Sequence, residues 1–299
     1  MKRREFMHDA GALGIALSLP VPVVAATMPA MKMAMRPIPA TGEQLPIVGF
    51  GNSQAFRDGD YENSEKLLDV LVDHGGSFID SWAPVQEVLG RYMHEHDGRN
   101  KLFLANNVGA SSEEGITENI RYTKEAQGKA VLDLLQLPNP TSFDKQWRWM
   151  RDAKDAGHAR YIGIAISKSR YYDMVESLIK SGTTDFIQVN YSLLETESDE
   201  RLLPLARDEG VAVITNRPFV NGRYFPLVKD RQLPPWAADF DCDSWAQFSL
   251  KYILANPAVN CVITETSKTR HAIDNLSAGF GRLPDEETRA QMLKLMRSF

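Results

Sequence analysis

The chain has 299 residues, 43% of them hydrophobic, and a formal net charge of -5 at neutral pH. This length and apolar content suffice for one sizeable core, and the mild negative charge excludes an electrostatic nucleic-acid binder. Beyond the first two dozen residues, no apolar stretch approaches the roughly 20 residues of a transmembrane helix. We therefore expect a small-molecule ligand or substrate, no nucleic-acid partner and no stable membrane insertion after cleavage of the N-terminal segment.

The first 26 residues have the features of an export signal. Lys2–Met7 resembles the twin-arginine motif, with paired arginines and an aromatic ring two positions on. Ala10–Leu19 is a short apolar core, and Val24–Ala26 offers small residues to signal peptidase. An ordinary membrane anchor or a frayed helix is the alternative. We expect residues 1–26 to be a twin-arginine signal peptide, the twin-arginine export machinery to be a partner, and the mature protein to be periplasmic or otherwise exported.

Residues 27–39 are rich in Met, Pro and Ala and predict a linker. Within residues 40–299, an apolar run followed by an amphipathic helix then repeats eight times. The runs are Ile47–Phe50, Ser77–Asp80, Leu102–Val108, Val131–Leu137, Tyr161–Ile166, Phe186–Tyr191, Val211–Thr215 and Cys261–Thr264. Such runs are typical of strands buried on both faces of a parallel sheet. Eight units in roughly 250 residues predict an α/β fold, the (β/α)8 TIM barrel, with functional residues at the C-terminal ends of the strands.

Polar side chains at these strand ends are expected to surround the barrel mouth. They are Asp80, Asn106, Asn107, Gln136, Asn139, Gln188, Asn190, Asn216 and Arg217. Asp80 has either a functional role or a role in supporting a neighbouring loop. Arg217 either holds a carboxylate or phosphate, or pairs with Asp80 or with an acid of an outer loop. Because His94 and His96 are two residues apart on a helix, they face different directions, and no metal site is expected.

Several segments, taken in order, resemble the aldo-keto reductase family. They are Ser77–Ser81, Glu87–Gly90, Lys101–Ala105, Leu132–Leu137, Arg160–Ile164, Gln188–Ser192, Asn256–Val259 and Ile263–Asn275. No single motif decides the resemblance, which rests on the order and spacing of all of them. It indicates an exported, twin-arginine-signal subgroup of the family with a degenerate set of catalytic residues.

In that family a hydride passes from NADPH to a carbonyl, and a Tyr supplies the proton. A Lys and an Asp adjust the pKa of the Tyr, and a His orients the substrate. The resemblance implies that Asp80 is the catalytic Asp. The position of the Lys is Asn107 and that of the His is Pro138. The Tyr has no counterpart, since counts from the two flanking motifs reach Trp82 and Val85, and neither side chain donates a proton.

The resemblance also implies an NADP site. Its contacts would be Gln188 near the nicotinamide, Thr266, Ser267, Lys268 and Arg270 near the 2′-phosphate, and Asn275 near the adenine. Asn216 stands where the family has an aromatic ring that stacks on the nicotinamide, and Arg217 follows it as a further candidate for binding the cofactor. Hydroxyls and cations at a helix N-terminus suit a phosphate. Ala165 and Ile166 stand where the family has a Ser-Asn pair, and Glu265 adds a like charge beside the phosphate site.

Together these features predict an NADP(H)-dependent oxidoreductase of carbonyl or alcohol substrates. The alternative is an exported, non-catalytic barrel that binds a ligand or a nucleotide. Because the family's acid, Lys and His are missing from the matched positions, the sequence predicts negligible reduction of ordinary aldehydes and quinones.

Overall fold

Eight parallel strands close into a barrel in this computed structural model, which describes residues 32–51, 56, 60–83, 85–96 and 102–299. β10 pairs with β3 and so joins the two ends of the sheet. The barrel strands are β3 (Val48–Phe50), β4 (Phe78–Ser81), β5 (Phe103–Asn107), β6 (Leu132–Pro138), β7 (Ala159–Ala165), β8 (Phe186–Asn190), β9 (Ala212–Asn216) and β10 (Cys261–Thr264). The predicted (β/α)8 fold is confirmed, whereas the signal peptide predicted for residues 1–26 lies outside the described residues.

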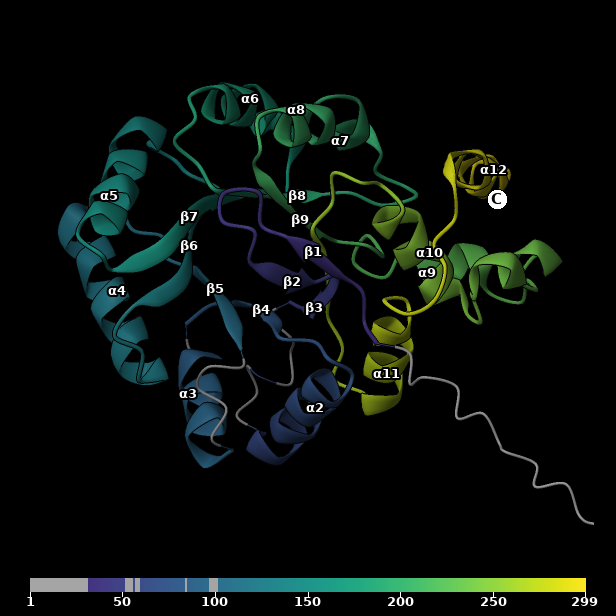
Figure 1. The fold of residues 1–299 in the computed structure, drawn as a ribbon, viewed down its shortest axis with the longest axis horizontal. Coiled ribbons are helices and arrows are strands. Elements are labelled where there is room, and N and C mark those ends of the chain that lie inside the picture. Colours follow the sequence, from purple (N-terminus) through teal and green to yellow (C-terminus); the bar gives the residue numbers. More distant parts are fainter. Residues whose placement is uncertain (1–31, 52–55, 57–59, 84, 97–101) are drawn as a thin grey trace, which may run out of the picture. The chain divides into compact units, whose positions relative to one another are not determined.

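Helices surround the strands (Figure 1). They are α2 (Tyr61–Asp73), α3 (Val85–Glu95), α4 (Glu113–Gln127), α5 (Phe143–Asp155), α6 (Tyr172–Lys180), α7 (Glu197–Glu200), α8 (Leu202–Asp208), α9 (Tyr224–Val228), α10 (Trp245–Leu254), α11 (Thr269–Ser277) and α12 (Glu286–Met296), with 3-10 turns η1 (Ser169–Tyr171) and η2 (Pro235–Phe240). Asp60, Ser112, Ser244 and Asp285 begin four of the helices by accepting a backbone N–H of the first turn. Among the described helices, none combines the length and apolarity needed to cross a bilayer.

Side chains of each strand alternate between the barrel interior and the helices, as the two-residue repeat of a strand requires. Phe78, Phe103, Tyr161 and Phe186 belong to the interior cluster, with ring centroids 5.5–6.1 Å apart between neighbours. Intervening residues such as Ile79 pack in the outer cluster with the helices. Because these rings fill the lower interior, a ligand can enter the barrel only above them, where the strands end.

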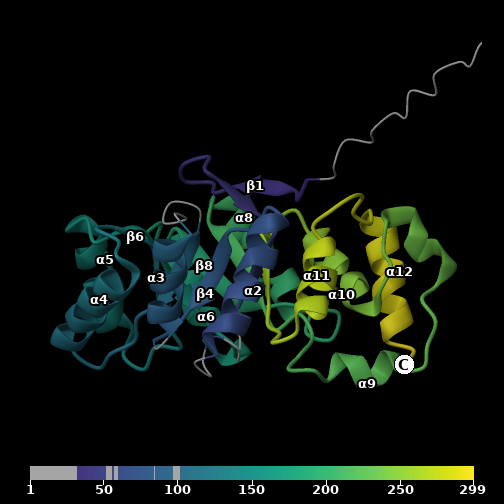
Figure 2. The ribbon, with the colours of Figure 1, turned by 90° about the horizontal axis from the view of Figure 1, so that it is seen from below.

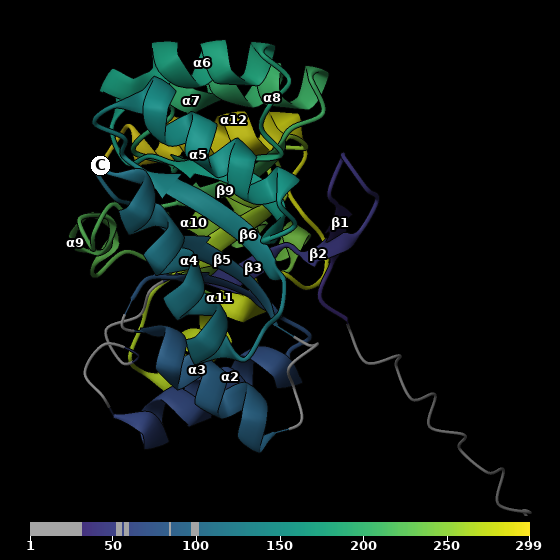
Figure 3. The ribbon, with the colours of Figure 1, turned by 90° about the vertical axis from the view of Figure 1, so that its left-hand side faces the viewer.

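A short hairpin covers the end of the barrel at which the strands begin. β1 (Met35–Pro37) pairs antiparallel with β2 (Gln44–Pro46), and Ile38 and Leu45 are buried in the interior cluster. The hairpin and α9 lie at opposite ends of the barrel (Figures 2 and 3). The linker predicted for residues 27–39 is therefore wrong for its described part, because Ile38 and its neighbours gain burial and hydrogen bonds against the barrel.

Long-range hydrogen bonds fix this hairpin to the last part of the fold. The Arg36 guanidinium donates to the backbone oxygens of Leu254, Asn256 and Val259, and the Asn260 side chain donates to the backbone oxygen of Pro37. The oxygen of Leu254 is at the C-terminus of α10, where a cation is favoured by the helix dipole.

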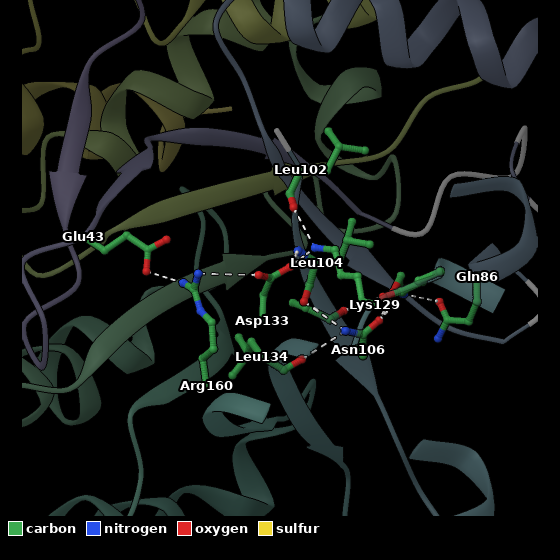
Figure 4. Close-up of polar contacts among 12 residues, drawn as sticks. Glu43, Gln86, Leu102, Leu104, Asn106, Lys129, Asp133, Leu134 and Arg160 are labelled. Carbon is green, nitrogen blue, oxygen red and sulfur yellow. Dashed lines mark hydrogen bonds and ion pairs between the residues drawn. The ribbon is translucent and has the colours of Figure 1, made fainter. Parts of the chain in front are cut away.

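A charged network lies at the same end of the barrel (Figure 4). The Asp133 carboxylate accepts the backbone N–H of Leu104 at 3.1 Å and pairs with Lys129. Arg160 lies 3.8 Å from Asp133 and also pairs with Glu43 of the hairpin. The network links β5, β6 and β7 to the loop between β1 and β2.

Candidate functional site

A cavity of about 460 Å³ opens at the C-terminal ends of the strands. Its polar lining comes from Asp80 of β4, Gln188 of β8, Asn216 of β9 and the following Arg217, and Glu265 beyond β10. Its apolar lining comes from Pro218, Phe219, Phe225 and Ile263. The structure therefore brings four of the predicted site residues, Asp80, Gln188, Asn216 and Arg217, into one cavity together with Glu265.

Asp80 lies at the base of this cavity with only 5% of its surface exposed. The Asn107 side-chain amide donates to Asp80 Oδ1 at 2.6 Å and to the backbone oxygen of Ser81 at 3.2 Å. Burial raises the pKa of Asp80 to about 7, and the charge of Glu265 acts in the same direction, against the lowering effect of hydrogen bonds from Asn107, Gln188 and Trp82. In the described part of the chain, Asp80 takes part in no ion pair.

Asn107 occupies the position that the resemblance gives to a lysine. Its amide holds the Asp80 carboxyl in place but brings no positive charge to it. Trp82 and Val85, the two positions at which the family's tyrosine was sought, differ in exposure. Val85 is buried in α3, and Trp82 is 39% exposed. Tyr191 cannot replace that tyrosine, because its hydroxyl donates to Asp199 at 2.8 Å, among contacts with Arg289 of α12.

Several buried amide atoms around Asp80 have no hydrogen-bond partner in the described part of the protein. They are Asn107 Oδ1, Gln136 Nε2 and Oε1, Gln188 Oε1 and Asn216 Oδ1. Leaving one such group unpaired costs about 1–3 kcal/mol, so native proteins satisfy them with a ligand or with ordered water. This upper layer of the interior is thus built to take polar groups.

The predicted position of Asn106 at the mouth is wrong. Its side chain points away from the interior and donates to the backbone oxygens of Leu104 and Leu134 (Figure 4), while its oxygen accepts from Ser81 and Gln127. Since Asn107 faces inward, the two-residue repeat of β5 turns Asn106 outward. Asn139 and Asn190 are engaged by the surrounding loops, through Ser167 and Glu195.

Arg217 pairs with an acid of an outer loop, one of the alternatives that the sequence left open. Its guanidinium lies 3.1 Å from Glu195, which is also 3.6 Å from Arg223. Sequence reasoning missed Glu195 and the aromatic pair Phe219 and Phe225, whose ring centroids are 4.9 Å apart. The available signal was two aromatic residues in the segment after β9, Phe219 in the loop and Phe225 in α9.

The predicted phosphate-binding residues gather where β10 leads into α11. The backbone N–H of Lys268, the N-cap residue of α11, donates to Thr266 Oγ1 at 3.1 Å. Ser267, Lys268 and Arg270 are exposed, so their hydroxyl and cationic groups are accessible to an anion. Asn275, in contrast, is buried on the packed side of α11, with only 4% of its surface exposed.

The comparisons with known proteins agree with this architecture. The model of the "Aldo/keto reductase family" matches residues 48–291. The "uncharacterized oxidoreductase YqkF" of Bacillus subtilis is 23% identical over 269 residues, covering 75% of this chain and 85% of that protein. An aldo-keto reductase of Gibberella moniliformis is 25% identical over 231 residues, covering 66% of this chain and 69% of that protein.

Two solved structures have the same fold. The holo form of aldo-keto reductase AKR11C1 from Bacillus halodurans superposes with a TM-score of 0.72 at 20% identity, over 88% of this chain and 96% of that chain. An aldo/keto reductase from Klebsiella pneumoniae in complex with NADP and acetate gives a TM-score of 0.71 at 17% identity, over 85% and 93% of the two chains. With its barrel, its mouth cavity and a family match over residues 48–291, this chain belongs to the aldo/keto reductase family.

Proposed function

We propose that this protein is an NADP(H)-dependent oxidoreductase that acts on carbonyl or alcohol groups. The observation that carries the proposal is the set of unpartnered amide oxygens at the mouth, because Gln188 Oε1 and Asn216 Oδ1 are acceptors for the N–H groups of a nicotinamide carboxamide. Thr266, Ser267, Lys268 and Arg270 would hold the 2′-phosphate. When bound, the reduced cofactor supplies a hydride. The NADP complex of the Klebsiella relative supports the same choice of cofactor.

A second candidate function is binding without turnover. Asn107 and Pro138 stand at the positions of the family's Lys and His, and no phenol stands at the position of its acid. A barrel of this kind would retain a nucleotide or another polar ligand in the mouth cavity and would not reduce ordinary aldehydes or quinones. Nucleotide binding with no detectable hydride transfer to any carbonyl would favour this candidate.

Nucleotide preference tests the phosphate site. Calorimetry is expected to show tighter binding of NADPH than of NADH, because each charge-assisted hydrogen bond to the 2′-phosphate contributes roughly 1.5–3 kcal/mol. Lys268→Ala with Arg270→Ala should reduce this preference by about tenfold or more. Lys294→Ala, at an exposed position of α12, is the control and should leave it unchanged. Equal affinity for the two nucleotides, or none for either, would contradict the site.

We further propose that the protein is exported through the twin-arginine machinery and cleaved near Ala26. A variant carrying Arg3→Lys and Arg4→Lys keeps the charge of the signal but removes the paired arginines. We expect it to stay in the cytoplasm, as measured by cell fractionation and N-terminal sequencing, while the control Lys2→Arg is exported. Normal export of the double variant would refute this route.

A further inference from the structure

We propose that Asp80 is the proton donor and acceptor of this site, so that its carboxyl does the work for which the family uses a phenol. The inference rests on the proposed oxidoreductase function and deepens it. Asp80 lines the mouth cavity, where the reacting groups of a substrate would lie. The hydrogen bond from Asn107, 2.6 Å long, fixes the orientation of the carboxyl group.

Among the residues that the structure describes, the groups that face Asp80 all permit a protonated carboxyl. Asn107 of β5 and Gln188 of β8 are neutral amides, and Trp82 of the loop after β4 is a neutral indole. Glu265, beyond β10, is negative and disfavours ionisation of Asp80. Arg217 lines the same cavity, but its guanidinium is paired with Glu195.

The resulting acidity suits proton transfer at neutral pH. Burial and the charge of Glu265 raise the pKa of Asp80 to about 7. A general acid works best when its pKa lies near the working pH, because it is then both partly protonated and able to release its proton. A buried carboxyl held neutral in this way is an established device of enzyme sites.

In the reductive direction, the carbonyl carbon accepts a hydride, with its electron pair, from the reduced nicotinamide, and the C=O π electrons move to oxygen. That oxygen takes the proton of Asp80, so an alcohol forms and Asp80 is left as a carboxylate. One proton from water then restores the acid. The carbonyl is reduced, the nicotinamide is oxidised, and the net consumption is one proton. In the reverse direction the Asp80 carboxylate accepts the hydroxyl proton.

The neutrality of Asn107 is the structural condition for this role. A lysine at this position would place an ammonium beside the carboxyl and lower the pKa of Asp80, because an opposite charge favours the ionised form. The replacement of the family's lysine by asparagine therefore fits the transfer of the acid role to Asp80. Asn107→Lys is expected to abolish turnover although Asp80 is still present.

The protonation state of Asp80 can be measured in the absence of turnover. In ligand-free protein labelled with carbon-13, its carboxyl signal, identified as the one lost in Asp80→Asn, is expected to titrate near neutrality. Because the folded pKa is raised, the stability that this group contributes is fully present below the unfolded pKa and lost as the pH rises toward 7. The free energy of unfolding should therefore fall from about pH 5 to pH 8 in wild type and fall less in Asp80→Asn. The control Asp208→Asn, at an exposed carboxylate, should behave like wild type.

Activity then tests the role itself. NADPH oxidation is measured with a panel of aliphatic and aromatic aldehydes, dicarbonyls and quinones. We expect the rate to fall above about pH 7, and to fall by about 10²–10⁴-fold in Asp80→Asn, with NADPH affinity unchanged. Asp80→Glu should retain part of the wild-type rate that Asp80→Asn loses.

An ordinary carboxyl pKa for Asp80, or full turnover by Asp80→Asn, would overturn the inference. NADPH binding by wild type with no oxidation across the panel would overturn the acid role alone and leave the nucleotide site standing. Absence of NADPH binding would overturn the proposed function and the inference together.

Discussion

Gly90→Ala is expected to lower the free energy of unfolding by more than about 3 kcal/mol, the upper end for overpacking a core. Gly90 lies within α3 where that helix meets α4. A Cβ atom there would be 1.8 Å from the backbone oxygen of Ala126 and 2.8 Å from its carbonyl carbon. Since the obstacle is backbone of a second helix, a side-chain rotation cannot relieve it, and the two helices must separate. Urea denaturation followed by circular dichroism would measure the loss.

Gly157→Ala is the matched control for this prediction. A Cβ at Gly157 meets no atom within 4 Å, but the residue has a φ of +74°. The left-handed conformation costs an alanine about 1–2 kcal/mol, which is less than the steric cost expected at Gly90. If the two variants had the same free energy of unfolding, the result would contradict the close approach of α3 and α4 at Gly90.

Asp133→Ala is expected to destabilise the barrel by about 3–5 kcal/mol, because it leaves a buried cation without its partner. Lys129 and Asp133 each have a side chain only 11% exposed. Removal of the carboxylate also leaves the backbone N–H of Leu104 without its acceptor. The free energy of unfolding, again from urea denaturation, would report the sum of these losses.

A double variant separates the buried charge from the packing. Asp133→Leu with Lys129→Met replaces the ion pair by apolar side chains of similar size, and such replacements are often neutral. We expect it to recover the part of the lost stability that comes from the unpaired Lys129 ammonium, but not the part that comes from the Leu104 N–H, which still has no acceptor. A loss below about 1 kcal/mol in Asp133→Ala, the range of exposed ion pairs, would show that Lys129 is adequately solvated without its partner.

The barrel could be predicted from the sequence because each strand carries its own signal. Val131–Leu137, for example, was predicted from its apolar run and is observed as β6, Leu132–Pro138. The hairpin strand at Met35–Pro37 was missed, since three residues containing a proline have no apolar repeat. Its order comes from contacts with residues more than 200 positions away, which local patterns do not encode.

The candidate site was predictable in position but not in chemistry. Asp80 and Gln188 were placed at strand ends by the barrel pattern, and the structure brings them into one cavity. Asn106 was misplaced because two adjacent strand residues cannot both face inward. The raised pKa of Asp80 depends on burial and on Glu265, 185 positions along the chain, and becomes visible only when the strands have been brought together.

The attachment of Arg36 has a consequence for the order of folding. Its acceptors are the backbone oxygens of Leu254, Asn256 and Val259. These residues lie 218 to 223 positions downstream and are therefore translated late. Contacts of such large sequence separation carry a loop-closure entropy that local helices avoid, and they tend to form slowly. A nascent chain that stops short of α10 therefore lacks these acceptors for Arg36, and the Arg36 attachment of the hairpin forms only when synthesis of the barrel is nearly finished.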